Sequence, residues 1–214
     1  MEAQRMEAPY PVRLSIDYPD RNLNRLTTFF RLIVGIPILI VLAVLSGGVG
    51  GAGWERGRDY VMVSSAGLLF LAPLLLILFR QKYPRWWFDW NLNLFRFQNR
   101  VFAFLSLMDD RYPSTDEDQA VHIEIDYPDA KRDLNRWLPL VKWFLAIPHF
   151  VVLLFLFIAA FVVVILAWFA ILFTGKFPRG MFDFVEGAFR WGARVQGYAI
   201  LLVTDRYPPF SLNP

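Results

Sequence analysis

Long apolar runs occupy the middle of each half of this chain, and short alternating segments flank them. Residues 60–79 form a run of 20 residues without a charge, which as a helix matches a hydrocarbon core of about 30 Å. A slightly shorter run extends from Leu32 to about Val49 and ends in the glycine-rich segment 46–53. The pattern predicts two transmembrane helices in the first half, joined by a flexible turn.

The second half has one longer apolar region, from Trp143 to Phe173. It holds 31 residues without a charge, enough for about 46 Å of helix. We favour two spans that turn near Ile158 to Val162, because this makes the two halves alike and the amphipathic flanks can extend both helices. That turn contains no Gly, Pro or Asn, which argues against it. The alternative is one tilted or kinked helix, which would place the C-terminal segment across the membrane.

Alternation with a period of two marks short segments outside the apolar runs. Apolar and polar positions alternate in residues 12–18 and again in residues 121–127. Each segment predicts a half-buried strand that ends in a Tyr-Pro-Asp turn. Two further strand-like runs are Val101 to Leu107 and Gln196 to Val203. Four strands would form one small sheet or two hairpin-like pairs, and a shared sheet would leave fewer open edges.

Two stretches carry apolar residues at steps of three and four, which predicts amphipathic helices in the plane of the membrane interface. These residues are Trp87, Trp90, Leu94, Phe97 and Val101 in the first half, and Met181, Phe184, Ala188, Trp191 and Val195 in the second. We expect interfacial aromatics at the level of the lipid headgroups: Trp86, Trp87, Trp90 and Trp191.

Pairs of arginines lie one turn apart on these helices: Arg96 with Arg100, and Arg190 with Arg194. One hypothesis is that their guanidinium groups bind lipid phosphates. The other is that they only follow the charge bias of the membrane or pair with neighbouring carboxylates, namely Asp89, Asp183 and Glu186.

The two halves repeat each other. The segment 12–20 returns as 121–129, and Asp-Arg-Tyr-Pro at 110–113 returns at 205–208. The offset between the copies is 111 residues from Pro37 to Pro148 and 94 residues from Pro84 to Pro178, so the second copy is shorter in the apolar stretch. We therefore expect two domains, residues 12–113 and 121–210. Each would run strand, two transmembrane helices, interfacial helix, strand, and the two would be parallel repeats.

Composition and charge agree with a membrane protein. Hydrophobic residues make up 56% of the chain, above the roughly 45–50% of soluble domains. The segments 1–31, 80–142 and 176–214 hold five, ten and five Arg and Lys, against two in the loops between the predicted spans. This bias places both termini in the cytoplasm. The predicted fold class is an α-helical integral membrane protein with four transmembrane helices and a small cytoplasmic β-sheet. No cleavable signal peptide is visible, and the absence of cysteine excludes disulfides.

A set of motifs resembles one known family. They are Asp-Tyr-Pro after a strand, Asn-Arg, Ile-Pro-His, Trp-Phe-Ala-Ile-Leu-Phe-Thr-Gly, Phe-Pro-Arg-Gly-Met-Phe and Asp-Arg-Tyr-Pro-Pro-Phe. The chain resembles the bacterial membrane family catalogued as domain of unknown function 4389 over almost its whole length, most tightly from Asn135 to Leu212. The first copy departs from it at residues 81–87 and has no histidine after Gly35-Ile-Pro. The resemblance implies a multi-pass protein of the bacterial cytoplasmic (inner) membrane and supplies no activity.

Residues with chemical potential are few. His149 is the only ionisable side chain inside a predicted span. It has either a proton or ion role or a structural one, bonding carbonyls that Pro148 frees. A duplicated polar set is expected to hold turns together across the sheet: Asp17, Asp126, Asp110, Arg111, Asp205 and Arg206. No spacing predicts a metal site, a phosphate-binding loop or a serine nucleophile.

We therefore expect no enzyme activity, no catalytic residue and no cofactor. The favoured function is an accessory or scaffold subunit of a larger membrane assembly, or a homo-oligomer. The alternative is a lipid-binding or transport component that uses the four arginines, and a membrane enzyme ranks third. Expected partners are the phospholipid bilayer and other membrane subunits or further copies of the chain. The basic charge follows from the cytoplasmic segments and does not predict nucleic-acid binding.

Overall fold

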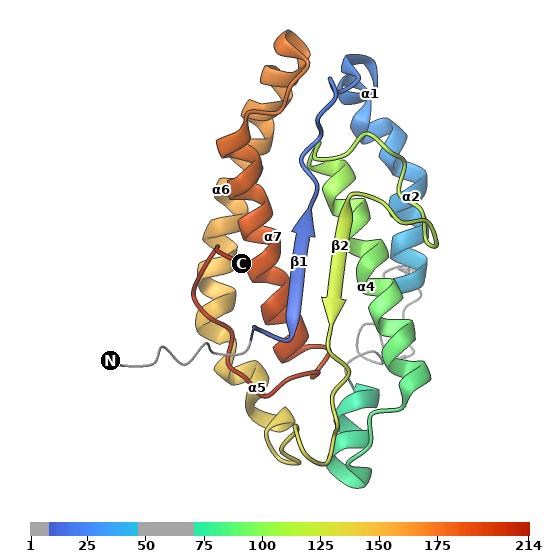
Figure 1. Ribbon diagram of the computed structural model, residues 1–214, viewed down its shortest axis with the longest axis vertical. Helices are drawn as coiled ribbons and strands as arrows, with labels where there is room; N and C mark the ends of the chain where they lie inside the picture. Colours follow the sequence, from blue (N-terminus) through green and yellow to red (C-terminus); the bar gives the residue numbers. More distant parts are fainter. Residues whose placement is uncertain (1–8, 47–70) are drawn as a thin grey trace, which may run out of the picture.

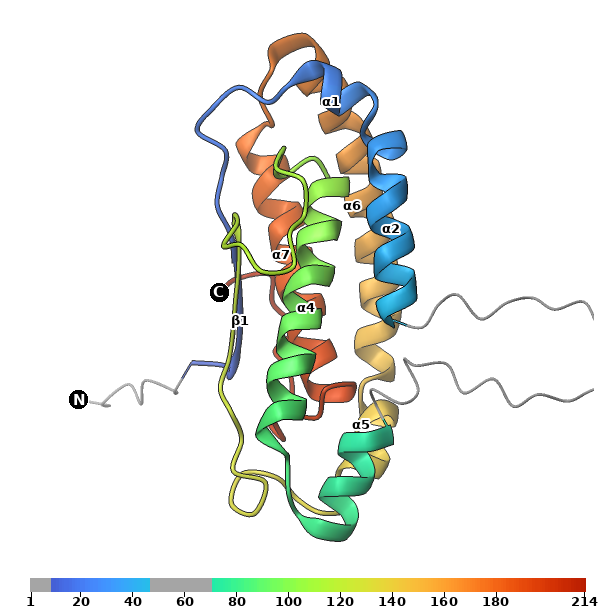
Figure 2. The ribbon, with the colours of Figure 1, turned by 90° about the vertical axis from the view of Figure 1, so that its right-hand side faces the viewer.

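The computed structural model describes residues 9–46 and 71–214, and their elements stack in three layers (Figures 1 and 2). A two-stranded sheet forms one outer layer. Helices α4 (Arg85–Leu105) and α7 (Arg179–Ala199) form the middle layer, and α2 (Arg31–Ser46) and α6 (Ile147–Thr174) form the other outer layer. Figure 2 shows the layers edge-on, with the sheet and the pair α2 and α6 on opposite sides of the middle helices.

The sheet joins the two halves of the chain. Strand β1 (Val12–Ile16) pairs antiparallel with β2 (Val121–Ile125), and the central pair is Leu14 opposite Ile123. Apolar side chains at alternate positions are buried because they pack against α7 and α4. The period-two prediction is confirmed for these two segments, and their polar positions form the outer face of the sheet.

The middle helices begin and end in similar ways. Each follows an extended proline, Pro84 before α4 and Pro178 before α7, which suits the helix start because proline has no N–H to leave unbonded. Beyond each helix lies a leucine in the left-handed region, Leu107 at φ 65° and Leu202 at φ 57°. That conformation costs a non-glycine residue about 1–2 kcal/mol. Both leucine side chains are buried in the core, and this burial offsets the strain.

The apolar outer layer has shorter helices at both ends. Helix α1 (Arg25–Phe29) precedes α2, and α5 (Pro139–Leu145) precedes α6. A further apolar helix covers Leu71–Arg80, and its last turn, η1 (Leu76–Arg80), is a π-helix. In Figure 2, α2 descends from α1 at the top, whereas α6 rises from α5 at the bottom. The two long apolar helices therefore run in opposite directions.

The prediction of two spans within residues 143–173 is wrong. Helix α6 continues through residues 158–162 as part of one helix of 28 residues. With no glycine or proline there, nothing interrupts the backbone hydrogen bonds. Among the described residues, α6 is the one helix long and apolar enough to cross a membrane.

The four transmembrane helices of the predicted fold class are accordingly not supported. In the first half, α2 has 16 residues and covers residues 32–46 of the span predicted from Leu32 to Val49. Of the span predicted at 60–79, the described part is helical. Residues 47–70, including the glycine-rich segment, lie outside the described residues.

Two predicted strands are also wrong. Residues Val101–Leu107 and Gln196–Val203 contain the last turns of α4 and α7 and the bends that follow them. Steps of three and four continue through Val101 and Val195, so a short apolar run fitted both periodicities. The sheet of the described residues therefore has two strands and no hairpin within either half.

Neighbouring elements of the two halves run in opposite directions. The strands β1 and β2 are antiparallel. Figure 1 shows α4 and α7 side by side with opposite chain directions as well. The prediction of parallel repeats rested on two spans in each half, which the continuous helix α6 does not support. How the repeats are related across a membrane stays a prediction, because a twofold axis along the membrane normal also reverses elements that lie in the membrane plane.

Candidate functional site

The outward surface of α2 and α6 is apolar over its whole length. On α6, exposed aliphatic and aromatic side chains recur at steps of three and four: Val151, Phe155, Ile158, Val162, Leu166, Phe169 and Phe173. A similar stripe follows α2: Ile33, Ile36, Ile40 and Val44. Contiguous apolar patches of this kind mark membrane or protein interaction sites. We call this surface the apolar face.

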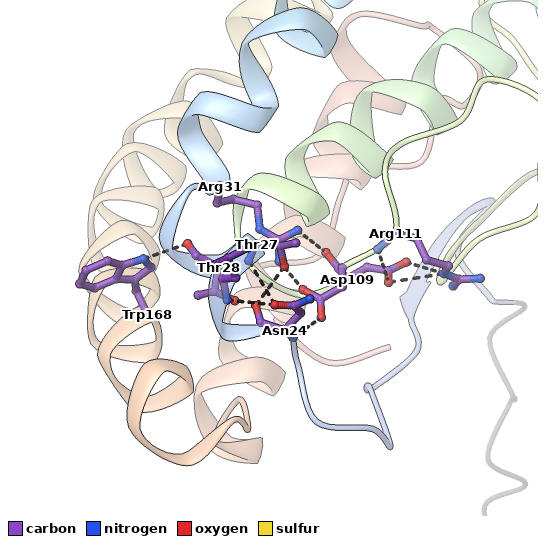
Figure 3. A network of polar contacts seen from close by, with 9 residues as sticks. Asn24, Thr27, Thr28, Arg31, Asp109, Arg111 and Trp168 are labelled. Carbon is purple, nitrogen blue, oxygen red and sulfur yellow. Dashed lines mark hydrogen bonds and ion pairs between the residues drawn. The ribbon is translucent and has the colours of Figure 1, made fainter.

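A buried ion pair fastens α2 to the segment after α4 (Figure 3). Arg31 Nη2 lies 2.5 Å from Asp110 Oδ1, and Arg31 Nη1 donates to the Asp109 carbonyl at 3.0 Å. The other carboxylate oxygen of Asp110 accepts from the Asn24 backbone N–H at 2.7 Å. The Arg31 guanidinium also lies 4.2 Å from the ring centre of Phe104. We call this arrangement the first clasp, since it holds α1 and α2 against the end of α4.

Figure 3 also shows how α6 joins this cluster. The Trp168 indole N–H donates to the Thr28 carbonyl of α1 at 3.1 Å. Asn24 caps α1 by accepting from the backbone N–H groups of Leu26 and Thr27, a favoured role for asparagine at a helix start. The first clasp therefore links the apolar helices α2 and α6 as well as α4.

A second clasp repeats the contacts of the first. Lys142 Nζ lies 2.7 Å from Asp205 Oδ1 and donates to the Thr204 carbonyl at 2.7 Å. Asp205 Oδ2 accepts from the Asn135 backbone N–H at 2.5 Å. Lys142 is completely buried, and its ammonium lies 5.2 Å from the ring centre of Tyr198. Burial lowers the pKa of Lys142, and the ion pair with Asp205 acts in the opposite direction.

Two tyrosines cross between the halves. Tyr18, after β1, donates to the Phe177 carbonyl at 2.6 Å, and Tyr127, after β2, donates to the Tyr83 carbonyl. Each tyrosine ring also lies under an arginine at the start of the opposite helix, Arg179 over Tyr18 and Arg85 over Tyr127. Each half therefore fixes the entry to the other half's middle helix.

The four arginines proposed for lipid binding have partners inside the chain. Arg96 donates to the Ile123 carbonyl in β2 at 3.1 Å, and Arg190 donates to the Leu14 carbonyl in β1 at 3.0 Å. The other two are buried. Arg100 donates to the Ser114 carbonyl at 3.0 Å, and Arg194 to the Asn213 carbonyl at 2.6 Å. These groups join the middle helices to the sheet and to the chain segments that follow the helices, and not to the apolar face.

His149 lies buried near the start of α6. Its Nδ1 accepts from the Trp191 indole N–H at 3.1 Å, and the ring stacks on Phe210 with centroids 4.0 Å apart. Tyr207 packs against it with centroids 4.8 Å apart. This imidazole therefore joins the C-terminal tail to α6 and α7, with an indole as its partner in place of the carbonyls expected from Pro148.

The predicted interfacial aromatics lie in different surroundings. Trp86 and Trp90 are exposed, Trp87 is half-buried, and Trp191 is buried beneath the tail. Two exposed tryptophans near α5, Trp137 and Trp143, were not among the predicted residues. Their position at the edge of a long apolar run is the signal from which interfacial residues could have been predicted.

The duplicated polar set is divided between the clasps and the sheet. Asp110 and Asp205 belong to the clasps. On the exposed sheet face, Asp126 lies 3.0 Å from Arg13, and Asp17 lies 2.9 Å from His122. The remaining members are the arginines of the two Asp-Arg-Tyr-Pro motifs. Arg111 pairs with Asp109 at 3.0 Å, and Arg206 donates to the Pro9 carbonyl at 3.0 Å.

A family model matches residues 137–211. This stretch contains Lys142 and Asp205 of the second clasp, both α6 and α7, and the His149 cluster. The matched stretch, 75 of the 214 residues, is similar to a domain of unknown function (DUF4389). The match agrees with the resemblance predicted to be tightest from Asn135 to Leu212, and the resemblance over the first half stays a prediction. Neither a curated protein nor a solved structure matches the chain.

The DUF4389 segment and α4 enclose a groove of about 660 Å³. Leu153 and Phe157 of α6 line it, with Phe102 and Leu105 of α4 among the other lining residues. Its few polar groups include the amides of Gln98 and Gln196, which lie 3.5 Å apart. Ligand pockets have volumes of about 300–1,000 Å³, so the groove has the size of a ligand site and a hydrocarbon-like lining.

The described residues form no evident reactive centre, within the DUF4389 segment or outside it. In residues 9–46 and 71–214, no three His, Asp or Glu side chains come together as metal ligands. The clasps use an arginine and a lysine as fixed partners of carboxylates and carbonyls. This arrangement holds helices in place and presents an apolar face.

Proposed function

We propose that this chain is a non-enzymatic protein of the bacterial cytoplasmic membrane and serves as a scaffold or accessory subunit of a larger membrane assembly, or assembles with itself. The observation that carries the proposal is the apolar face of α2 and α6, exposed along both helices. The opposite side, formed by the sheet, carries ion pairs between exposed side chains. A molecule divided in this way needs a bilayer or another apolar protein surface to cover one side.

The clasps support a scaffold role. The Arg31–Asp110 and Lys142–Asp205 pairs fasten the apolar helices to the middle layer, and the crossed tyrosines fasten the two halves to each other. Removing one partner of a buried pair is strongly destabilising. The apolar face is thus held on a fixed frame, as the docking surface of a subunit requires.

We also propose that residues 12–113 and 121–210 are two copies of one unit. The clasps, the crossed tyrosines and the left-handed leucines each occur once per half. The register of β1 and β2 is centred on Leu14 and Ile123, as expected for two equivalent strands around a twofold axis. In this arrangement α6 corresponds to α2 followed by the helix Leu71–Arg80, and the first copy has 17 additional residues between Pro37 and Pro84.

Both termini are proposed to lie in the cytoplasm. The charge bias of the sequence favours this side for residues 1–31 and for the segment from Lys176 onward. The C-terminus and β1 both lie on the sheet side of the middle helices (Figure 2). A molecule that turns its apolar face to the membrane would therefore keep the sheet and the C-terminus together on the aqueous side.

The test of the assembly is the mass of the intact particle after mild solubilisation. The chain alone has a mass of 24.9 kDa. We expect a particle of defined larger mass, either a multiple of the chain or the chain with a partner in fixed ratio. A monomer as the sole protein species would contradict the scaffold function.

The test of the face uses two matched variants. Phe155→Glu/Val162→Glu places two negative charges on the apolar face and should release the protein from the membrane fraction. Ser15→Glu/Thr115→Glu adds the same charge at two exposed positions outside it and should leave the protein in that fraction. Equal retention of both variants in the membrane fraction would contradict the proposal that the apolar face holds the protein in the membrane.

A further inference from the structure

The apolar helix layer and the polar sheet lie on opposite sides of α4 and α7 and overlap along the long axis of the molecule (Figure 2). Helix α6 has 28 residues, about 42 Å of helix, which exceeds a hydrocarbon core of about 30 Å. If α6 crossed the bilayer upright, the sheet would lie at hydrocarbon depth. The exposed Arg13, Glu124 and Asp126 on that sheet are strongly disfavoured there. With α6 parallel to the membrane, the whole sheet stays in water.

Exposed cations lie at both ends of the apolar helix layer. Arg25 of α1 donates to the Phe173 carbonyl near the end of α6, and Lys176 follows that end. Arg80 and Lys82 lie at and just after the end of the helix Leu71–Arg80. All four side chains are exposed. Cations beside an apolar surface complement the phosphates of an anionic leaflet.

The sheet side carries a different charge pattern. Arg13 pairs with Glu124 and Asp126 there, and His122 contacts Asp17. The loop before β2 adds three exposed carboxylates, Asp116, Glu117 and Asp118. Exposed tryptophans near the starts of α4 and α5 add residues that favour the headgroup region: Trp86, Trp90, Trp137 and Trp143. The charge pattern and the tryptophans together favour a lipid leaflet over a second copy of the chain as the occupant of the apolar face.

We propose that the apolar face binds one leaflet of an anionic phospholipid bilayer, with α2 and α6 parallel to the membrane plane. Arg25 and Lys176 meet lipid phosphates at one end of the layer, and Arg80 and Lys82 meet them at the other. This proposal rests on the proposed membrane function and names the leaflet as the partner of the same surface. It also moves lipid contact away from Arg96, Arg100, Arg190 and Arg194, whose guanidinium groups bind carbonyls.

The orientation is measured with single cysteines, because the chain has none of its own. Val151→Cys, Val162→Cys and Phe173→Cys lie along the exposed stripe of α6. Each variant is spin-labelled in vesicles of phosphatidylglycerol and phosphatidylcholine, and depth is read from collisions with oxygen and with a nickel chelate. We expect one shallow depth for all three labels, about 5–10 Å into the boundary. An upright helix would instead place the Val162 label deeper than the others by about 15 Å.

The phosphate contacts are measured with matched charge variants. Arg25→Gln/Lys176→Gln removes two cations from one end of the layer, and Arg13→Gln/Arg111→Gln removes two from elsewhere. Quenching of tryptophan fluorescence by brominated phosphatidylglycerol and brominated phosphatidylcholine gives the relative affinity for the anionic lipid. We expect the preference for phosphatidylglycerol to fall about threefold or more in the first variant and to stay unchanged in the second. Equal losses in both variants would overturn the phosphate contacts.

The depth measurement separates this proposal from the membrane function. A deep centre with shallow ends overturns the parallel orientation and leaves a membrane scaffold in place. Labels that neither oxygen nor the nickel chelate reaches show that a protein surface covers the face, and this overturns the leaflet as occupant. Labels in water, on protein that washes off the vesicles, overturn the proposed membrane function itself.

Discussion

Lys142 shows at the residue scale how a clasp responds to pH. Burial lowers its pKa from the ordinary value of 10.5, so the folded protein releases this proton at a lower pH than the unfolded chain. Between the two pKa values the unfolded state binds more protons, and the free energy of unfolding therefore rises with pH. This contribution stops growing once pH passes 10.5, where both states have lost the proton.

We predict that Lys142→Met removes this rise. The free energy of unfolding is measured in both proteins at several pH values from about 7 to 10, and the wild type should gain on the variant as pH increases. Burial raises the pKa of Tyr10 and Tyr83, which lowers stability above their ordinary pKa, but both tyrosines are present in both proteins. If the free energy of unfolding of the wild type fell relative to that of Lys142→Met as pH rises, the rise could not be assigned to Lys142.

Gly197 sets the distance between α7 and the sheet. A Cβ there would lie 2.6 Å from Val12 Cγ2, whereas a Cβ at Gly180 in the same helix would meet nothing within 4 Å. We predict that Gly197→Ala lowers the free energy of unfolding by about 1–3 kcal/mol through overpacking. Gly180→Ala should leave it unchanged or raise it by up to about 1 kcal/mol. Denaturant unfolding measures both free energies. Adding Val12→Ala should raise the free energy of unfolding of the Gly197→Ala protein, because it removes the clashing methyl groups, and should not raise that of the Gly180→Ala protein.

At the scale of elements, α6 decides the architecture of the second half. Its continuity can be measured directly as a distance between exposed positions near its two ends, Ile147 and Phe173. As one straight helix these residues lie about 39 Å apart, whereas a hairpin would bring them close together.

We predict that spin labels on Ile147→Cys/Phe173→Cys give one distance distribution centred near 40 Å in double electron–electron resonance, from about 1.5 Å of rise per residue. Val151→Cys/Phe155→Cys, one turn apart, is the matched control for labelling and helix formation. A distribution below about 20 Å would restore the two-span interpretation, because two adjacent helices pack at about 8–10 Å.

The sequence predicts those elements whose pattern is decided locally. Alternation located β1 and β2, and steps of three and four located α4 and α7. In the run from Trp143 to Phe173 every face is apolar, so periodicity does not distinguish one helix from two. The lack of Gly, Pro and Asn near residues 158–162 was the local signal for a single helix, and the packing of this helix along α7 lies outside any short window.

The same limit applies to the site. The Asp-Arg-Tyr-Pro motifs marked Asp110 and Asp205, but their partners Arg31 and Lys142 lie more than 60 residues away in sequence. The arginines of the middle helices have the charge and spacing that suit lipid phosphates. In the folded protein, however, Arg96 and Arg190 donate to backbone carbonyls of the sheet. Whether the polar face of an amphipathic helix contacts water, lipid or protein depends on which other elements pack against it. For α4 and α7 that element is the sheet, whose strands come from distant parts of the sequence.

At the scale of the whole molecule, the sheet and the crossed tyrosines join two halves that each contribute one strand and one middle helix. The loop between the halves is exposed at residues 115–118, so cutting it removes no buried contact. The contacts between the halves should then suffice to hold them together.

We predict that residues 1–115 and 116–214, produced as separate chains in one cell, co-purify at a ratio of 1:1 in mild detergent. Leu14→Lys in the first chain places a charge at the buried centre of the sheet and should abolish the association, while Ser15→Lys on the outer face should not. Failure of the unsubstituted halves to associate would show that the link between them is required.

The pairing of β1 with β2 also sets an order of events during synthesis. More than 100 residues separate the two strands, and ribosomes add about 5–20 residues per second. For roughly 5–20 seconds the nascent β1 has an open edge and no partner of its own chain. The β2 strand of a neighbouring nascent chain has the same sequence, so it can pair with β1 in the same register and with the same backbone hydrogen bonds. Crowded polysomes therefore favour exchanged dimers, in which each chain completes the sheet of the other.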